Sequence, residues 1–561
     1  MQIRLAFVIL FLACSVTVRG QYMLRMIDSE TGDEFAIDSN LPTDSLGQMA
    51  KVTSILEEWR TKGYLLASLD NVMKLADTLS VQVYRGKQFE YLNFTSTNVP
   101  PQILKKVGFT NRKLSFTEWG KVRKLMLDYS ENHGYPFAEL ELDSLKETQE
   151  GVFAALNYRA GSEVVFDTLI VKSNERLKVQ KKFFHTYLGI KEGDLFSQKG
   201  VKEVEKRIKA LPYLVLERIP EVRFENNKAN VELFLKRRKA NTIDGIVGFL
   251  PNAQEEGKLL LTGQLKLDLY NPLGTGKHVF FEWQRLKEAS QTLNILYEHP
   301  NLLKTPLDLE AKFFLQKEDS SYINLNRKLG LKYRFPSGGM SGFFTEWKDS
   351  RSIEEEGSEG QKYPDSNVLL YGVSYQQIDL DDFFFPRKGY TIDFSIAGGD
   401  KAVTLQTESM TDSISNLTQI EINTDFKQYI KTGKNSTLFL RENIGWMYSD
   451  TLFLNDLYRV GGFKSLRGFN EAEFFVSAYG ICTVEWRLFF EQQSYLFLFT
   501  DGGWINSGVD GDTKIPIGIG SGLSFATKAG VFNLAYAIGK VAGQPFSAKL
   551  AKVHFGLVSR F

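Results

Sequence analysis

One arginine in this chain carries a charge that its surroundings would have to neutralise. It stands near the centre of a glycine-rich stretch, Gly461-Gly462-Phe463-Lys464-Ser465-Leu466-Arg467-Gly468-Phe469-Asn470-Glu471. The flanking segments, 436–447 and 477–490, alternate apolar and polar residues like membrane strands. An arginine held between such strands needs a carboxylate, because a buried guanidinium without a partner is costly. The chemistry expected here is therefore ion pairing.

Two carboxylates follow on the next segments and are the candidate partners of Arg467. Glu485 lies in Thr-Val-Glu-Trp-Arg, and Asp501 lies in Phe-Thr-Asp-Gly-Gly-Trp. We interpret the stretch as a loop folded into a barrel lumen, with Arg467 paired to Asp501 and Glu485. The spacing alone also fits a solvated turn with a surface arginine.

Other kinds of site find little support in the residues. The segment 273–277 resembles a phosphate loop, but Asn271 and His278 stand where that motif needs Gly and Ser or Thr. Asp379, Asp381 and Asp382 cluster as calcium ligands could, but a solvated loop is the better explanation. Neither a Gly-x-Ser-x-Gly elbow nor a His-Glu-x-x-His motif occurs.

Composition narrows the class of protein further. Two cysteines, Cys14 and Cys482, and five scattered histidines predict no metal site, and we expect no cofactor and no enzymatic activity. Lys+Arg 68 against Asp+Glu 67 gives a net charge of +1, which argues against a nucleic-acid partner. Aromatic residues make up 13%, as expected where aromatic girdles meet lipid.

The first twenty residues predict a secretory signal peptide, 1–20. Arg4 supplies the positive start, an apolar run follows, and Gly20 is a small residue at the expected cleavage site. A lipoprotein leader ending at Cys14 is the alternative. No later window contains the roughly 18 apolar residues that a membrane helix needs. A secreted chain of this kind can still cross a membrane as a closed barrel.

Residues 22–239 show an internal repeat of one plan: a strand, two helices and two strands. We place the three α+β modules at 22–87, 88–162 and 163–239. Gly63-Tyr64 and Gly134-Tyr135 mark equivalent positions in the first two, and Pro212-Tyr213 fills this position in the third. The landmarks recur about every 70–80 residues, a domain-sized period.

From 241 to 561 the pattern changes to alternating strands with turns between them. In 307–313, for example, Leu, Leu, Ala and Phe share one face, and Asp, Glu and Lys share the other. Such alternation predicts a transmembrane antiparallel β-barrel of about sixteen strands. The segments 271–274 and 385–389 suit short periplasmic turns, whereas 349–363 and 400–416 suit long extracellular loops.

The two ends of the barrel predict a weak closing seam. The last segment, 553–561, places Phe555 and Phe561 on one face like a C-terminal membrane strand. It must close against the first strand, where Gly245 and Gly248 offer no side chains to pack. We therefore expect weak pairing between the first and last strands.

Two motifs in this order resemble those of the outer-membrane assembly factor superfamily, typified by BamA and TamA. Leu466-Arg467-Gly468-Phe469 is similar to its Arg-Gly-Phe/Tyr signature, and 499–503 is similar to its Phe-x-Asp-x-Gly strand motif. The modules resemble POTRA domains, and three of them make the layout closest to that of TamA. The resemblance implies a bacterial outer-membrane barrel with periplasmic modules, in which Arg467 pairs with acidic groups on the wall.

The resemblance also implies a function without catalysis. POTRA-like modules would receive unfolded outer-membrane protein clients by β-strand addition, and the seam would open sideways to pass them into the bilayer. A TamB-like partner anchored in the inner membrane could bind the first module.

Three alternatives stay open. The modules could be spacers. A two-partner-secretion transporter usually has two such modules and an N-terminal plug helix, and neither is seen here. A passive pore would explain the barrel alone.

Overall fold

The computed structural model describes most of the chain. The described residues are 23–35, 45–75, 78–110, 113–148, 151–251, 259–285, 290–319, 321–353, 363–407, 410–508, 511–527 and 530–560. The expected signal peptide and Phe561 lie outside them. Two compact units are distinguished, one of residues 1–164 with 195–197, and one of residues 165–194 with 198–561.

The first unit begins with a four-stranded module. Its elements are β1 (Met23–Asp28), β2 (Glu34–Phe35), α2 (Ser45–Thr61), β3 (Ser68–Leu75) and β4 (Thr78–Tyr84), and the sheet order is β2-β1-β4-β3. The helix buries Val52 and Leu56 against Met26 and Val81 of the sheet. The described part of this module contains one helix, and residues 36–44 are not described.

The second module repeats the plan with both helices present. It consists of β5 (Tyr91–Thr97), α3 (Pro101–Val107), β6 (Lys113–Ser115), α4 (Phe116–Glu131), β7 (Glu139–Thr148) and β8 (Gly151–Arg159). Helix α4 begins where it does because Ser115 and Glu118 form a reciprocal capping box.

None of the helices in the described ranges is long and apolar enough to cross a membrane.

The third module belongs to the second unit. It contains β9 (Val165–Lys172), α5 (Lys181–Leu188), α6 (Gln198–Lys209), β10 (Leu214–Leu216), β11 (Glu221–Glu225) and β12 (Lys228–Arg237). Strand β12 is central and pairs parallel with β9. The pairs β1 with β4 and β5 with β8 are parallel in the same way. The three modules therefore share the order of their three main strands, β1-β4-β3, β5-β8-β7 and β9-β12-β11, and differ in where a short fourth strand is added.

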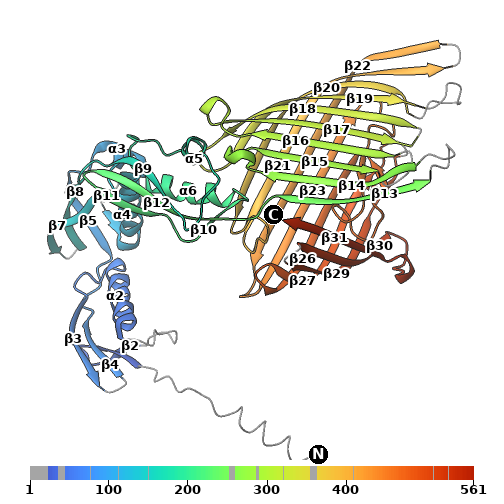
Figure 1. Cartoon of the computed structure of the whole chain (residues 1–561). Coiled ribbons are helices and arrows are strands. Elements are labelled where there is room, and N and C mark those ends of the chain that lie inside the picture. Colours follow the sequence, from blue (N-terminus) through green and yellow to red (C-terminus); the bar gives the residue numbers. More distant parts are fainter. Residues whose placement is uncertain are drawn as a thin grey trace, which may run out of the picture. The chain divides into compact units, whose positions relative to one another are not determined.

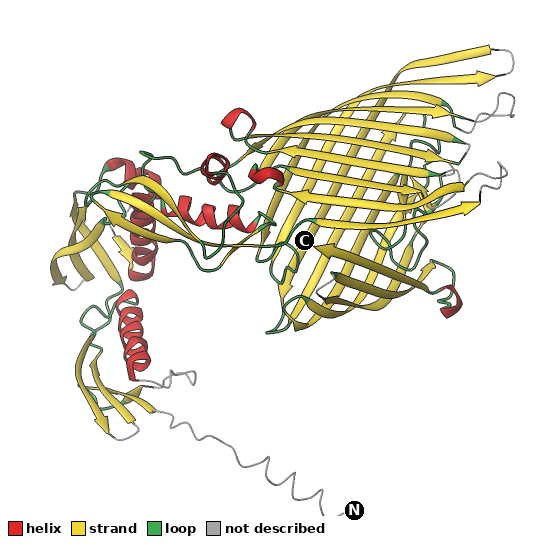
Figure 2. Cartoon of the chain, viewed as in Figure 1, coloured by secondary structure: helices red, strands yellow, loops and turns green. Residues whose placement is uncertain are grey.

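The rest of the second unit is a closed antiparallel barrel, which confirms the predicted fold class (Figures 1 and 2). Strand β28 (Thr513–Lys514) pairs only with the last two residues of β27, and β29 pairs with the rest of that strand, so sixteen strands close the barrel. They are β13 (Thr242–Pro251), β14 (Leu259–Tyr270), β15 (His278–Arg285), β16 (Gln291–His299), β17 (Leu307–Glu318), β18 (Tyr322–Arg334), β19 (Met340–Ser352), β20 (Asp365–Leu380), β21 (Gly389–Thr407), β22 (Met410–Lys431), β23 (Ser436–Ser449), β26 (Ala478–Glu491), β27 (Ser494–Asn506), β29 (Pro516–Ala526), β30 (Val531–Val541) and β31 (Lys552–Arg560).

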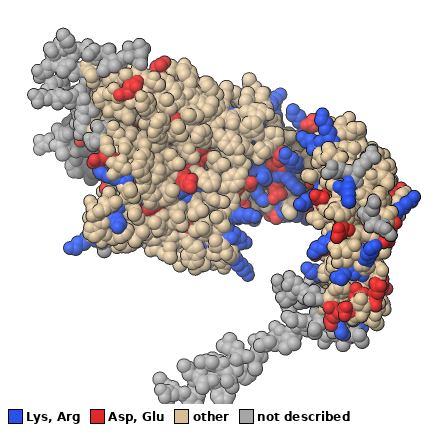
Figure 3. All heavy atoms as spheres, turned by 180° about the vertical axis from the view of Figure 1, so that it is seen from behind, with Lys and Arg blue, Asp and Glu red and all other residues tan. Residues whose placement is uncertain are grey.

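The outer face of the barrel is apolar. Trp486, Leu498 and Tyr536 are among the large exposed side chains, while Thr483, Glu485 and Asp501 on the same strands are buried inside. In Figure 3 the barrel wall is mostly tan, and charged residues gather at its ends and on the modules. This distribution fits a wall in contact with lipid and a polar lumen.

One expected loop is part of the strands instead. Residues 400–416 were expected to form a long extracellular loop, but β21 continues to Thr407 and β22 begins at Met410. The polar residues there can sit in strands because this hairpin extends past the neighbouring strands (Figure 1). Its faces therefore need not alternate in polarity, which removes the signal that marks a half-buried strand.

Candidate functional site in the barrel lumen

The predicted site lies in the segment that joins β23 to β26, residues 450–477, which we call the lumen loop. Within it β24 (Tyr458–Val460) pairs with β25 (Phe474–Val476). A tight turn follows β24, where Gly462 bridges Leu466 and Glu471 accepts a hydrogen bond of 2.8 Å from the Phe463 amide. The loop is therefore a folded hairpin with its own hydrogen bonds.

Arg467 lies between the two carboxylates that the sequence analysis paired with it. Its Nε is 2.8 Å and its Nη2 is 2.7 Å from the two Asp501 oxygens, and its Nη1 is 2.5 Å from Glu485. The Arg467 amide also donates to Asp501, and the guanidinium carbon lies 3.5 Å from the centre of the Phe499 ring. With its side chain 10% exposed, this is a buried, bidentate and fully paired cation.

Two further side chains, Thr483 and Arg487, orient the carboxylates by hydrogen bonds. The Thr483 hydroxyl donates to Asp501 at 2.9 Å, and Arg487 Nε donates to Glu485 at 2.8 Å. The Arg487 guanidinium in turn lies over the rings of Phe439 and Tyr495. Two arginines therefore balance two carboxylates. The alternation of Thr483, Glu485 and Arg487 along β26 was the available signal for Arg487, to which the sequence analysis assigned no role.

Glycines let the loop backbone lie directly on the wall. Gly468 has φ +93°, and a Cβ there would be 2.6 Å from the backbone nitrogen of Gly539 on β30. A Cβ on Gly518 of β29 would be 2.0 Å from the carbonyl oxygen of Arg467. The flanking Leu466 and Phe469 are buried in the cluster around them. The Leu-Arg-Gly-Phe motif thus combines an ion pair, a backbone contact and two apolar contacts.

A second attachment of the lumen loop to the barrel wall was not predicted from the sequence. The Lys401 ammonium of β21 lies 2.6 Å from the Asp456 carboxylate, and Asn455 donates to Ser350 at 2.7 Å. Arg459 forms a further ion pair of 2.6 Å with Glu318 of β17. Lys401 fell inside the expected extracellular loop, so its place in a strand was not considered.

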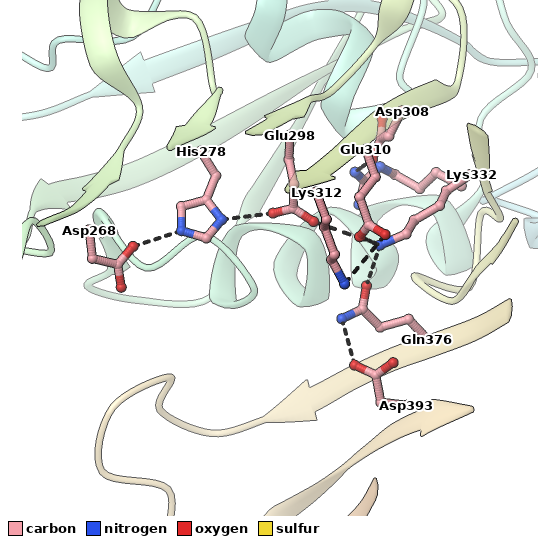
Figure 4. Close-up of polar contacts among 10 residues, drawn as sticks. Asp268, His278, Glu298, Asp308, Glu310, Lys312, Lys332, Gln376 and Asp393 are labelled. Atoms are coloured by element: carbon pink, nitrogen blue, oxygen red, sulfur yellow. Dashed lines mark hydrogen bonds and ion pairs between the residues drawn. The ribbon is translucent and has the colours of Figure 1, made fainter. Parts of the chain in front are cut away.

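A separate polar network joins side chains of neighbouring barrel strands, at the end of the barrel nearer the third module (Figure 4). His278 lies between two carboxylates, 2.7 Å from Asp268 and 2.8 Å from Glu298. The chain of contacts continues through Lys332, 2.5 Å from Glu310 and 3.7 Å from Glu298. All of these side chains except Asp268 line a cavity of about 500 Å³ that Tyr187 and Tyr213 of the third module also line. Among the described residues, no group of His, Cys, Asp and Glu side chains is arranged to hold a metal ion.

The seam pairs very few residues. In the described part of the chain β13 and β31 share two register pairs, Thr242 with Arg560 and Ile243 with Ser559, whereas β13 and β14 share ten. Gly245 and Gly248 face Leu265 and Thr262 of β14, beyond the paired part of the seam. Phe555 is 69% exposed on the outer face. Of the predicted seam residues, only Phe561 lies outside the described residues.

These features define a class: an outer-membrane β-barrel protein with small α/β modules before its barrel and a loop folded into its lumen. The model of the Omp85 superfamily domain matches residues 271–561. The chain belongs to the Omp85 superfamily. A comparison with curated protein sequences gives no match.

Solved structures of similar fold cover nearly the whole chain. CdiB from Escherichia coli is 12% identical, with a TM-score of 0.55 over 93% of this chain and 100% of that chain. CdiB from Acinetobacter baumannii is 11% identical, with a TM-score of 0.53 over 94% and 100%. BamA from Haemophilus ducreyi lacking POTRA domains 1–3 is 16% identical, with a TM-score of 0.43 over 84% and 100%.

Proposed function

We propose that this protein assembles other proteins into the outer membrane, receiving unfolded clients on its POTRA-like modules and passing them into the bilayer at the β13–β31 seam. The observation that carries the proposal is the seam itself. Two register pairs close it, while the neighbouring strands β30 and β31 share seven. Unpaired backbone groups on β13 can accept a client strand, because strand addition needs main-chain partners more than a particular sequence.

The position of the lumen loop favours a sideways route through the seam over a path straight through the barrel. Attachments on β17, β21, β26 and β27 hold the loop across the lumen, through Glu318, Lys401, Glu485 and Asp501. A loop held in this way obstructs a straight path through the barrel, which favours a sideways route over a passive pore. In this proposal Arg467 is the lock that keeps the loop beside β26–β30, next to the seam.

The first module offers an edge for client capture. Strand β3 is at the end of its sheet and pairs only with β4 among the described strands. Its Leu69, Val72 and Met73 are large apolar side chains that are exposed. An exposed apolar edge strand is a template for pairing with another chain. The same edge could take a TamB-like partner instead of a client.

A two-partner-secretion transporter is the second candidate. The fold similarity to CdiB, which extends over the full length of the CdiB chains, favours it. Such a protein would release its substrate outside the cell, whereas an assembly factor leaves its client in the membrane. The location of the product therefore separates the two functions.

A disulfide across the seam tests the proposal directly. The register partners Ile243 and Ser559 are changed to cysteine in a chain whose Cys14 and Cys482 are replaced by serine. The control places cysteines at Leu523 and Leu534, register partners on the fully paired β29 and β30. Full-length protein in liposomes is then given an unfolded outer-membrane protein, and client folding is followed by protease resistance.

We expect the oxidised seam disulfide to abolish client insertion and a reductant to restore it, while the control disulfide has no effect. Full insertion with the seam closed would refute the seam route. Client appearing inside the liposome lumen in place of the bilayer would favour the secretion transporter. A steady wide conductance in a planar bilayer would favour the passive pore.

A further inference from the structure

Two neighbouring turns at the periplasmic end of the barrel are built alike. The turn between β14 and β15 reads Asn271-Pro272-Leu273-Gly274-Thr275, and the turn between β16 and β17 reads Asn301-Leu302-Leu303-Lys304-Thr305. Each contains a short helical turn, visible as red ribbon at the barrel end in Figure 2. In each, the asparagine is left-handed and the threonine hydroxyl donates to the carbonyl three residues earlier.

Both turns hold the third module by the asparagine side chain. Asn271 Nδ2 donates to the Lys178 carbonyl at 2.8 Å, and Asn301 Nδ2 donates to the Phe183 carbonyl at 3.3 Å. The Gln180 amide adds a bond of 2.8 Å to the Gly274 carbonyl. These contacts fix the segment 178–183 across the two turns.

The side chain of the leucine at the third position of each turn takes no part in these contacts, although the Leu273 carbonyl accepts a bond of 3.3 Å from Gln180. Leu273 has φ 58° and is 93% exposed, and Leu303 has φ 53° and is 86% exposed. A left-handed backbone is unfavourable for a bulky residue and easy for glycine. Each turn therefore presents a fully exposed apolar side chain at a position that strain alone would give to glycine. The two strands between the turns set their tips about 10 Å apart.

Basic residues surround these leucine tips. Lys178, Lys181 and Lys182 lie on the segment that the turns hold, and 236–239 reads Lys-Arg-Arg-Lys just before β13 begins at Thr242. Lys178, Lys181, Lys182 and Arg237 form no ion pair through their side chains with any described residue. The end of β12 and the segment 178–183 thus bring two unpaired cations, Arg237 and Lys178, close to the start of the first membrane strand.

A groove of about 210 Å³ joins the cations to one of the tips. Lys178, Arg237, Arg238 and Leu273 are among its lining residues. Arg238 is already paired with Asp382 at 2.7 Å, which leaves Lys178 and Arg237 free to bind an anion. The groove therefore combines unpaired cations with the exposed Leu273.

We propose that this groove binds the phosphate headgroup of an anionic phospholipid of the periplasmic leaflet, with Leu273 and Leu303 inserted among its acyl chains. The position favours a lipid over other anions. The groove lies where the first membrane strand begins, and the outer face of the barrel is apolar. Clustered Lys and Arg beside a membrane segment attract anionic lipid, and an exposed leucine next to them gains by entering the acyl region.

Native mass spectrometry of the full-length protein in mild detergent tests the site by titration with phosphatidylglycerol. One variant removes the charges, Lys178→Gln with Arg237→Gln. A second removes the tips, Leu273→Gly with Leu303→Gly, and should fold at least as stably because glycine relieves the left-handed strain. The control removes two exposed cations of other periplasmic turns, Lys388→Gln with Lys434→Gln. Inorganic phosphate is added as a competitor.

We expect each test variant to weaken the tightest phosphatidylglycerol adduct by on the order of tenfold, and the control to leave it unchanged. Inorganic phosphate should not displace the lipid. Equal adducts in all variants would overturn the site. Loss of the adduct in the control as well would show that the lipid binds by general charge attraction, and would also overturn the site. Displacement by phosphate alone, with no effect of the leucine changes, would assign the groove to a free anion and overturn the lipid proposal.

Discussion

The Lys401 ammonium and the Asp456 carboxylate lie 2.6 Å apart, and the Lys401 side chain is completely buried. Lys401 also donates to the Thr451 carbonyl at 3.0 Å, and Asp456 accepts from the Phe453 amide at 2.9 Å. The pair therefore fixes the start of the lumen loop to β21, while Arg467 fixes its tip to β26 and β27. With the ion pair between Arg459 and Glu318 of β17, the loop is held at three separate points on the wall.

Removing one member of the buried pair should be costly. Lys401→Met leaves the Asp456 carboxylate without its cation, so we expect a loss of about 3–5 kcal/mol in the free energy of unfolding. Lys401→Met combined with Asp456→Asn should recover part of this loss, because no buried charge is then left unpaired. Urea unfolding in lipid vesicles measures both.

Lys464→Met is the matched control for the buried lysine. Lys464 is largely exposed and lies 3.6 Å from Glu282. An exposed pair of this kind contributes at most about 1 kcal/mol. Similar losses for the Lys401 and Lys464 variants would contradict the second attachment.

The contact of the loop backbone with β30 predicts a sharp difference between two glycines. Gly468→Ala would press a Cβ against the Gly539 backbone at φ +93°, whereas a Cβ at Gly480 meets nothing within 4 Å. We expect Gly468→Ala to displace the loop and to cost at least about 2 kcal/mol, and Gly480→Ala to be nearly neutral. The displacement would appear as new protease cleavage within 461–471. Equal protection in both variants would refute the close contact.

Arg207 of α6 joins the third module to a barrel turn. Its guanidinium donates to the Leu188 carbonyl at 2.6 Å, the Tyr187 carbonyl at 3.3 Å and the Pro336 carbonyl at 3.1 Å. Burial lowers the pKa of Arg207, although an arginine stays charged at neutral pH. Arg207→Lys keeps the charge but cannot reach all three acceptors, so we expect a loss of about 1–3 kcal/mol.

Hydrogen exchange checks the Arg207 prediction. Amides in 185–189 and 335–339 should exchange faster in Arg207→Lys, and those of β5 and β8 in the second module should not change. Lys202→Arg, at an exposed position of the same helix, is the control. Unchanged exchange at 335–339 would show that the Pro336 contact contributes nothing.

Glu232 gives the third module a defined acid sensitivity. It lies on the central strand β12, 2.5 Å from Lys172 and 3.3 Å from Arg223. The hydrogen bond from Lys172, aided by the charge of Arg223, lowers the pKa of Glu232. Because the folded pKa lies below the unfolded value of about 4.3, the stabilisation is complete above that pH and is lost as pH falls through the folded pKa.

We therefore expect Glu232→Gln to destabilise the module at pH 7 and to have little effect once the pH is below the folded pKa of Glu232. Thermal unfolding followed at several pH values measures this convergence. A constant difference between the two proteins at all pH values would contradict the ionic origin of the effect. Glu225→Gln, at an exposed position on β11, should leave the unfolding temperature of the module unchanged at both high and low pH.

The fold could be predicted largely because each part repeats. Strict alternation in 307–313 marks β17, and the recurring Gly-Tyr pairs mark the modules. Strands β21 and β22 were harder, because polar residues occupy both faces where the hairpin extends past its neighbours. Local sequence gives no signal for such an extension.

At the site, the sequence suggested the partners of Arg467 because a buried guanidinium demands carboxylates on nearby strands. It could not suggest Lys401 with Asp456, since the two are 55 residues apart and depend on the path of the loop. The groove beside Leu273 could not be predicted for a related reason. Its cations come from two separate segments of the third module, and only the tertiary structure brings them close to Leu273.

The central claim is that Arg467 locks the lumen loop onto the wall through Asp501 and Glu485. Hydrogen exchange of the full-length protein in lipid, comparing Arg467→Ala with the unchanged chain, tests it most directly. We predict that amides of 461–471 exchange at least about tenfold faster in the variant, while the barrel strands β14–β19 keep their protection. Unchanged exchange of 461–471 in Arg467→Ala would contradict the lock.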